Sequence, residues 1–251
     1  MSIKHPIISV TGSSGAGTST VKHTFQQIFR RESVKAATLE GDAFHRYNRV
    51  EMKKELEKRN TNGGATFSHF SFEANLLQEL EECFRNYSEK GKCRYRHYVH
   101  NAKEEELYGA KPGNFTEWQQ FDDSSDLLFY EGLHGAVVSE NLNIARYADL
   151  KIGVVPVINL EWIQKIHRDR DSRGYSTEAV TDTILRRMHA YVHCICPQFT
   201  ETDINFQRVP VVDTSNPLVA RWIPTADESL VVIRFKDCLL YTSDAADEWI
   251  G

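Results

Sequence analysis

The stretch IISVTGSSGAGTST, residues 7–20, decides the fold class of this chain. It begins with an apolar run typical of a buried strand and continues into a loop whose glycines follow the spacing G-x-x-x-x-G. Apolar side chains then recur at helical spacing over residues 18–31, which predicts a helix. A strand, a glycine-rich turn and a helix together form the context in which this loop spacing cradles phosphate groups.

Glycines in the loop lack the Cβ atom that would keep backbone N–H groups away from an anion. The N-terminus of the following helix adds partial positive charge at the same place. The predicted binding site for the phosphates of ATP comprises Gly12, Ser13, Ser14, Gly15, Ala16, Gly17, Thr18, Ser19 and Thr20. The alternative is a glycine-rich turn that holds no ligand.

Thr18 stands where the lysine of such a loop normally holds the phosphates, and Ser19 follows at the hydroxyl position that ligates Mg²⁺. Two interpretations remain open at this point. The loop belongs either to a nucleotide site that has lost its cation or to one that obtains positive charge from another segment.

A second apolar strand, LLFYEG at residues 127–132, ends in the acid Glu131. A glutamate at a strand end is by itself most often a solvated surface group. Together with the upstream loop it predicts a carboxylate ligand for Mg²⁺ beside the phosphates.

The segment GDAFHRYNRVEMKK, residues 41–54, combines an acid with several basic groups. Asp42 follows the predicted strand in VKAATLEGD, at the edge where ligands of open α/β sheets collect. His45, Arg49 and Lys53 lie four residues apart, which predicts that they share one helical face. This pattern suits a base that takes a hydroxyl proton while cations hold a substrate phosphate. The alternative is a solvated basic helix.

The segment KIHRDRDSRG, residues 165–174, supplies the missing positive charge. Lys165, Arg168 and Asp169 can converge on one side of a helix end, where the cations could close over nucleotide phosphates. The alternative is a salt-bridged surface helix.

The composition excludes several classes of protein. The chain has 251 residues, 41% of them apolar, which is enough for one large core. Its net charge of -5 argues against a nucleic-acid-binding protein. Neither a membrane span nor a signal-peptide core is evident, and the five cysteines form no disulfide framework, so we expect a cytoplasmic protein.

Strands and helices alternate along the chain, which predicts an α/β fold around a largely parallel sheet, in a single domain over residues 1–235. Further predicted strands are 94–100, 150–157, 209–213 and 229–235. Further predicted helices are 72–91, 159–174 and 176–195.

Many strings in this chain resemble those of the bacterial-type phosphoribulokinases: VTGSSGAGTST, EGDAFHR, FSHFSFEAN, YEGLHGAV, INLEWIQKIHRDR, RGYSTEAV, ILRRMHAYVHCI, TDINFQRVPVVDTSNP and WIPTADES. The resemblance runs from Ile3 to Phe235. It implies a P-loop NTPase fold like that of nucleoside-monophosphate kinases. It also implies transfer of the ATP γ-phosphate to the 1-hydroxyl of ribulose 5-phosphate, in Calvin cycle carbon fixation. Bacterial members carry threonine at the position of Thr18, so the missing lysine does not indicate an inactive protein.

By position, the resemblance implies that Asp42 is the catalytic base and that Ser19 and Glu131 ligate Mg²⁺–ATP. It also implies three further catalytic residues: Lys165 and Arg168, which stabilise the transferring phosphoryl group, and Asp169, an acid important for turnover. Positions that match residues holding the sugar phosphate are His45, Arg49, Tyr98, His100 and Arg173, to which Lys53 is added as the helical neighbour of Arg49.

The resemblance further implies a homo-oligomer that NADH activates and AMP inhibits. It stops after Phe235, and CLLYTSDAADE within residues 236–251 looks like a translated adapter sequence. We therefore expect a non-native tail in place of the C-terminal part of the family domain. Rival functions are a uridine kinase-like small-molecule kinase, which would lack the FSHFSFEAN and DINFQRVP strings, and an ATP-binding regulator without turnover.

Overall fold

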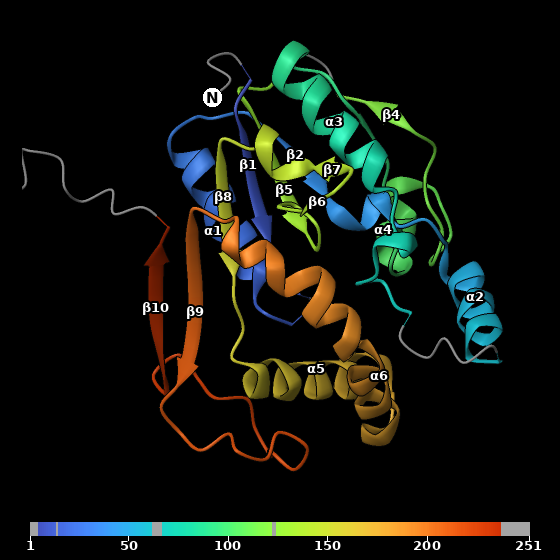
Figure 1. Ribbon diagram of the computed structural model, residues 1–251, viewed down its shortest axis with the longest axis vertical. Helices are drawn as coiled ribbons and strands as arrows, with labels where there is room; N and C mark the ends of the chain where they lie inside the picture. The colour runs from blue at the N-terminus through green and yellow to red at the C-terminus, as the bar shows by residue number, and fades with distance from the viewer. Residues whose placement is uncertain (1–4, 14, 62–66, 122–123, 237–251) are drawn as a thin grey trace, which may run out of the picture.

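A computed structural model of the chain describes residues 5–13, 15–61, 67–121 and 124–236. Within these residues the main sheet has six strands in the order β10-β9-β8-β1-β5-β2 (Figure 1). The strands are β1 (Ile7–Thr11), β2 (Ala36–Glu40), β5 (Leu127–Gly132), β8 (Leu150–Val154), β9 (Ile204–Pro210) and β10 (Ser229–Phe235). In the described sheet β9 and β10 run antiparallel and the other neighbouring pairs run parallel, which confirms the prediction of a largely parallel α/β sheet.

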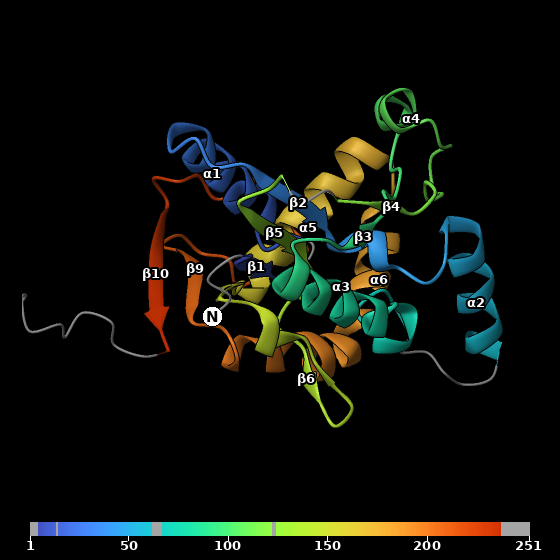
Figure 2. The ribbon, with the colours of Figure 1, turned by 90° about the horizontal axis from the view of Figure 1, so that it is seen from above.

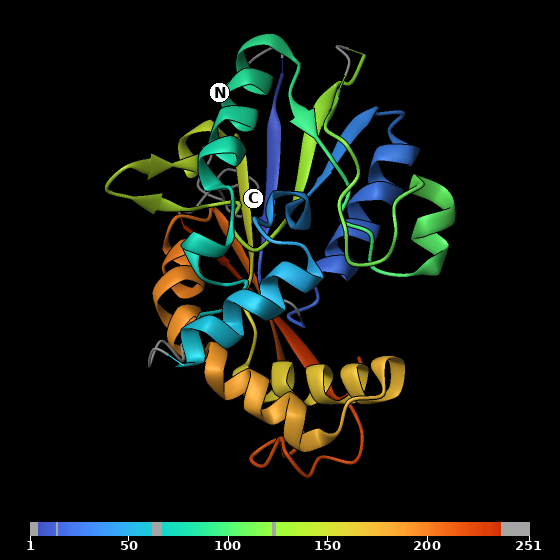
Figure 3. The ribbon, with the colours of Figure 1, turned by 90° about the vertical axis from the view of Figure 1, so that its right-hand side faces the viewer.

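Helices lie on both faces of the sheet and beyond its carboxyl edge. The helices of the described residues are α1 (Thr18–Arg31), α2 (Arg49–Thr61), α3 (Leu77–Lys90), α4 (Ala102–Tyr108), α5 (Ile158–Arg173) and α6 (Thr177–Ala190). Figures 2 and 3 show α1 and α3 on opposite faces, and Figure 1 shows α5 and α6 beyond the carboxyl ends of the parallel strands. None of the helices in the described part of the chain is long and apolar enough to cross a membrane.

Short elements connect these layers. The two-residue strands are β3 (Arg94–Tyr95), β4 (Gln119–Gln120), β6 (Val138–Ser139) and β7 (Leu142–Asn143). The short helical turns are Gly41–Phe44, Phe72–Ala74, Ile144–Tyr147, Tyr191–Ile195 and Cys196–Thr200.

The side chains of β5 alternate between the hydrophobic cores on the two faces of the main sheet. Successive side chains of a strand point to opposite faces of the sheet. Leu128 and Tyr130 join the core beneath α3, whereas Phe129 joins the core beneath α1, where its ring lies 5.3 Å from that of Phe25. The same alternation places Glu131 on the α1 face, at the end of the strand and beside the glycine loop.

Three predicted strands were wrong in extent. β8 covers residues 150–154 and not 150–157. β9 covers residues 204–210 and not 209–213, because the polar Asn205, Gln207 and Arg208 interrupt the apolar pattern of a strand that the sheet nevertheless pairs on both sides. The predicted strand at 94–100 is reduced to β3 and an isolated bridge between Tyr98 and Phe115.

Candidate functional site

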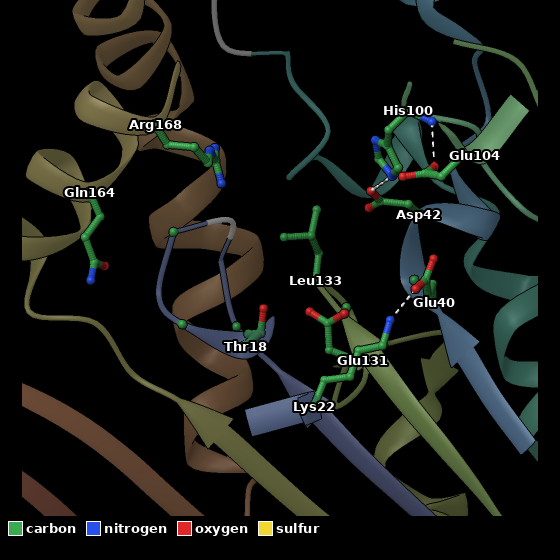
Figure 4. Close-up of a pocket in the computed structure, with 15 residues that line it drawn as sticks. Thr18, Lys22, Glu40, Asp42, His100, Glu104, Glu131, Leu133, Gln164 and Arg168 are labelled. Carbon is green, nitrogen blue, oxygen red and sulfur yellow. Dashed lines mark hydrogen bonds and ion pairs between the residues drawn. The ribbon is translucent and has the colours of Figure 1, made fainter. Parts of the chain in front are cut away.

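The carboxyl ends of β1, β2 and β5 open into a cavity of about 550 Å³ (Figure 4). Gly12, Gly41 and Gly132, which stand at these strand ends, line it. The other lining residues are Gly15, Gly17, Thr18, Lys22, Glu40, Asp42, His100, Glu104, Glu131, Leu133, Gln164 and Arg168. The cavity therefore brings together residues from each of the four segments that the sequence indicated.

The glycine loop has a backbone that other residues would adopt only with strain. Gly15 and Gly17 have φ angles of 118° and 103°, in the left-handed region that favours glycine. A Cβ atom on Gly12 would lie 2.8 Å from the Thr18 side chain and 2.9 Å from the Val154 carbonyl oxygen. Gly17 is the N-cap of α1, so no capping side chain competes with an anion at this helix end.

Two acids lie side by side where β2 and β5 end. Glu40 and Glu131 are paired in the parallel register of these strands. Burial raises the pKa of the Glu131 carboxyl, while a hydrogen bond with Thr18 and the positive charge of Lys22 oppose that rise. Lys22 forms an ion pair with Glu40.

Lys22 was missed by the sequence analysis, although its position one helical turn after Thr18 is the available signal. A cation therefore stands near the loop, contributed by α1 itself.

Asp42 lies in the helical turn after β2, with its side chain 39% exposed to the cavity. Its carboxylate oxygens lie 3.1 Å from Nε2 of His45 and 3.3 Å from Nε2 of His100. Burial alone would raise the pKa of Asp42, but the two imidazoles outweigh it and hold that pKa well below its usual range. The hydrogen bond with Asp42 in turn raises the pKa of His100. The cavity thus contains an ionised carboxylate.

The prediction that His45 shares a helical face with Arg49 and Lys53 was wrong. His45 has extended backbone angles, and α2 begins only at Arg49. Asn48 caps that helix, because its Oδ1 accepts a hydrogen bond from the backbone N–H of Glu51 at 2.9 Å and its own N–H donates to the Glu51 carboxylate at 2.9 Å.

The other candidate residues for the sugar phosphate lie around this point. Arg49 is exposed and donates to the backbone oxygen of His100 at 3.1 Å. The Tyr98 ring lies 4.9 Å from the ring of His100 and 6.1 Å from that of His45. Lys53 is exposed on α2, outside the cavity lining. Ser14 and the side chains of Ser19 and Arg173 lie outside the described residues.

The predicted cation cluster on α5 is divided between the cavity and the interior. Arg168 and Gln164 reach the cavity from the side opposite Asp42 (Figure 4). Lys165 is buried and donates to Asp169 at 2.5 Å, and Arg168 donates to the same carboxylate at 3.0 Å. Burial lowers the pKa of Lys165 to about 8, and the nearby charge of Arg187 acts in the same direction. Asp169 therefore holds both cations in position.

Glu161 connects α5 to the glycine loop and was also missed. Ser13 is turned into the interior, where its hydroxyl donates to Glu161 at 2.6 Å. A Cβ atom on Gly15 would lie 3.3 Å from the Glu161 side chain. Burial raises the pKa of Glu161 to about 7. Ala16 packs against the core beneath α1, while Thr20 is exposed.

Comparison with known proteins decides the family. The model of the Phosphoribulokinase / Uridine kinase family matches residues 7–215, which include every candidate site residue. The chain belongs to this family.

Individual members of the family are very similar to this chain. Phosphoribulokinase 1 of Cereibacter sphaeroides is 74% identical over 237 residues, which cover 94% of this chain and 82% of that protein. The solved structure of phosphoribulokinase from Rhodobacter spheroides matches with a TM-score of 0.85 and 68% identity, over 99% of this chain and 86% of that one. This match confirms the predicted P-loop kinase fold. A D-glycerate 3-kinase from Cryptococcus neoformans, at 12% identity and a TM-score of 0.53 over 81% of this chain and 86% of that one, shares the fold alone.

Proposed function

We propose that this protein transfers the γ-phosphate of ATP to the 1-hydroxyl of D-ribulose 5-phosphate, giving ribulose 1,5-bisphosphate and ADP. The observation that carries the proposal is the cavity in which the ionised Asp42 shares one space with the glycine loop, Glu131 and Arg168. The substrate's identity is supported by family relatives named phosphoribulokinase, whose length this chain largely covers.

Asp42 acts as the general base. Its charge is maintained at neutral pH, and its partly exposed carboxylate opens to the space where an acceptor hydroxyl would lie. The hydroxyl proton moves to Asp42 as the oxygen attacks the γ-phosphorus. One O–H bond breaks and one O–P bond forms, while the bond from the γ-phosphorus to the bridging oxygen breaks and ADP leaves with its electron pair.

The glycine loop and α5 hold the nucleotide end. Backbone N–H groups of the loop and the N-terminus of α1 bind phosphate oxygens, and Arg168 with Lys165 neutralises charge on the transferring group. Asp169 orients both of these cations.

The residues at this end of the cavity also fit Mg²⁺. Glu131 lies beside the glycine loop, where its carboxylate bonds to Thr18, and oxygen donors are the ligands that Mg²⁺ prefers. Glu131 and Ser19 would hold the ion. When bound, Mg²⁺ neutralises the β- and γ-phosphates.

The sugar phosphate binds at the other end of the cavity. His100 lines this end, and His45, Tyr98 and Arg49 surround it. We also assign Arg173 and Lys53 to the binding of the sugar phosphate.

The test is the substitution Asp42→Asn, which removes the base and keeps its shape. Turnover, measured as ADP release that depends on ribulose 5-phosphate, should fall by a factor of about 10² to 10⁴, while ATP binding persists. Asp213→Asn is the matched control, because Asp213 is exposed and does not line the cavity. Near-normal turnover of Asp42→Asn contradicts the mechanism. Faster turnover with uridine as acceptor favours a uridine kinase, and nucleotide binding without any acceptor-dependent ADP release favours a regulator.

Other properties are proposed from the family resemblance alone. They are activation by NADH, inhibition by AMP, assembly into homo-oligomers and a cytoplasmic location.

A further inference from the structure

The two imidazoles that contact Asp42 are held very differently. The His45 side chain is 7% exposed and its Nε2 faces Oδ1 of Asp42 at 3.1 Å. The His100 side chain is 39% exposed and its Nε2 faces Oδ2 at 3.3 Å. His45 therefore belongs to the fixed interior, whereas His100 borders the cavity.

The fixed orientation of His45 originates at Asn75, a residue 2% exposed. The amide nitrogen of Asn75 donates to the backbone oxygens of His69 and Ser71, each at 2.8 Å. A carbonyl oxygen cannot donate, so these two bonds fix which end of the Asn75 amide is nitrogen. The amide oxygen consequently faces Nδ1 of His45 at 2.8 Å, and Nδ1 must carry a hydrogen.

Neighbouring contacts prevent the ring from turning. His45 and Asn75 form an isolated antiparallel bridge, and the His45 ring lies against that of His69, tilted by 36° with centroids 4.3 Å apart. With its Nδ1 turned to Asn75, the ring presents Nε2 to Oδ1 of Asp42 at 3.1 Å. This contact agrees with the lowered pKa of Asp42.

Other titratable groups around this pair do not provide the same contact. His69 packs against His45, and Nε2 of His134 lies 3.1 Å from the amide nitrogen of Asn75. Burial lowers the pKa of both imidazoles, that of His134 to about 3, so both rings are neutral. Arg96 donates to the backbone oxygen of His45 at 2.7 Å. The charged or titratable side chains that line the cavity together with Asp42 are Lys22, Glu40, His100, Glu104, Glu131 and Arg168.

We propose that Asn75 is a positioning residue for phosphoryl transfer: it holds the His45 ring against Oδ1 of Asp42 and so leaves Oδ2 as the oxygen that accepts the substrate proton. The inference rests on the proposed role of Asp42 as base. The acceptor O–H bond breaks, an H–Oδ2 bond forms, and the electron pair of the acceptor oxygen forms a bond to the γ-phosphorus. The bond from the γ-phosphorus to the β–γ bridging oxygen breaks, and ADP leaves with that electron pair. His100 leaves Oδ2 as the hydroxyl arrives, which its exposed position allows.

The direct test is nitrogen NMR of the full chain with ¹⁵N-labelled histidine, without nucleotide or metal. His45, assigned by its loss in His45→Gln, should show a hydrogen on Nδ1. An unprotonated Nδ1 would overturn the proposal, whatever the behaviour of any variant.

The kinetic test compares Asn75→Ala with Asn75→Asp. The alanine variant removes the acceptor for Nδ1, so kcat should fall on the order of a hundredfold while KM for ATP stays within about twofold. Its acid limb in the pH profile of kcat should move to higher pH, because burial raises the pKa of Asp42 once the fixed donor is lost. The aspartate variant keeps an acceptor toward Nδ1 but loses the donors to the His69 and Ser71 oxygens, so its acid limb should lie between that of the parent and that of the alanine variant.

The matched control is Asn205→Ala. Asn205 is also buried, accepts from Thr202 at 2.7 Å and donates to the Phe199 backbone oxygen at 3.1 Å, away from the cavity. It reports the general cost of deleting a buried, hydrogen-bonded asparagine. An acid limb of Asn75→Ala that coincides with that of Asn205→Ala would refute the positioning role. This result is distinct from failure of the proposed function, which would show as activity in Asp42→Asn.

Discussion

Replacing Glu161 by glutamine should raise the free energy of unfolding, relative to that of the parent protein, as the pH rises from 5 to 8. Glu161 is 6% exposed and accepts a hydrogen bond from Ser13 on one oxygen, while its other oxygen has no hydrogen-bond partner among the described residues. An ionised carboxylate in such a place lacks the hydration it would have in the unfolded chain. Glutamine has nearly the same shape and carries no charge at any pH.

The magnitude follows from the pKa. Burial raises the pKa of Glu161 from 4.5 to about 7, which corresponds to about 3 kcal/mol of difference between the two protonation states. Because the folded state binds this proton more tightly than the unfolded state, the resulting stabilisation is complete below pH 4.5 and is lost as the pH rises through about 7. Between pH 4.5 and pH 8, the free energy of unfolding of Glu161→Gln should therefore increase by about 3 kcal/mol relative to that of the parent protein. A fixed cost of about 1–3 kcal/mol for the buried amide applies at both pH values.

The assay is thermal unfolding of both proteins near pH 5 and pH 8, supported by urea titrations. For a chain of this length the gain corresponds to a relative shift in Tm of roughly 5–10 °C. Glu106→Gln, at an exposed position on α4, is the control and should show no such shift. A Tm difference between Glu161→Gln and its parent that is equal at the two pH values would refute the argument.

Three further substitutions test the cavity. Gly15→Ala should weaken ATP binding about tenfold or more in a fluorescent-nucleotide titration. Alanine at a φ of 118° is strained by about 1–3 kcal/mol, and its Cβ would press on Glu161. Unchanged affinity would mean that the loop conformation is not required. Lys22→Met should lower the Tm of the metal-free protein, since Glu40 and Glu131 lose their counter-ion. Added Mg²⁺ should restore part of the lost Tm. A Tm equal to the parent's would show that the lysine is not needed. Arg49→Ala should raise KM for ribulose 5-phosphate about tenfold to a hundredfold with little change in kcat, and an unaltered KM would exclude Arg49 from substrate binding.

The residues of the cavity that could be predicted from sequence are those that a short local sequence pattern identifies without any knowledge of distant contacts. The glycine loop lies between a strand and a helix, and Asp42 and Glu131 directly follow or end apolar strands. In a parallel sheet these strand ends meet at one edge, so local patterns were sufficient to bring them together.

The remaining contacts depend on tertiary structure. Asn75 lies thirty residues from His45 in sequence, and no periodic pattern links the two. His45 itself was misplaced on α2 because a spacing of four residues also occurs where the backbone is extended. The importance of Glu161 arises from burial against Ser13, which helical spacing on α5 alone does not reveal.

The side-by-side glutamates at the ends of β2 and β5 have a consequence for the fold. Like charges in register repel, and the lysine on the first helix answers that repulsion from within the same polypeptide. The chain itself therefore compensates these two acids, so the fold needs no dissolved cation to hold the two strand ends together.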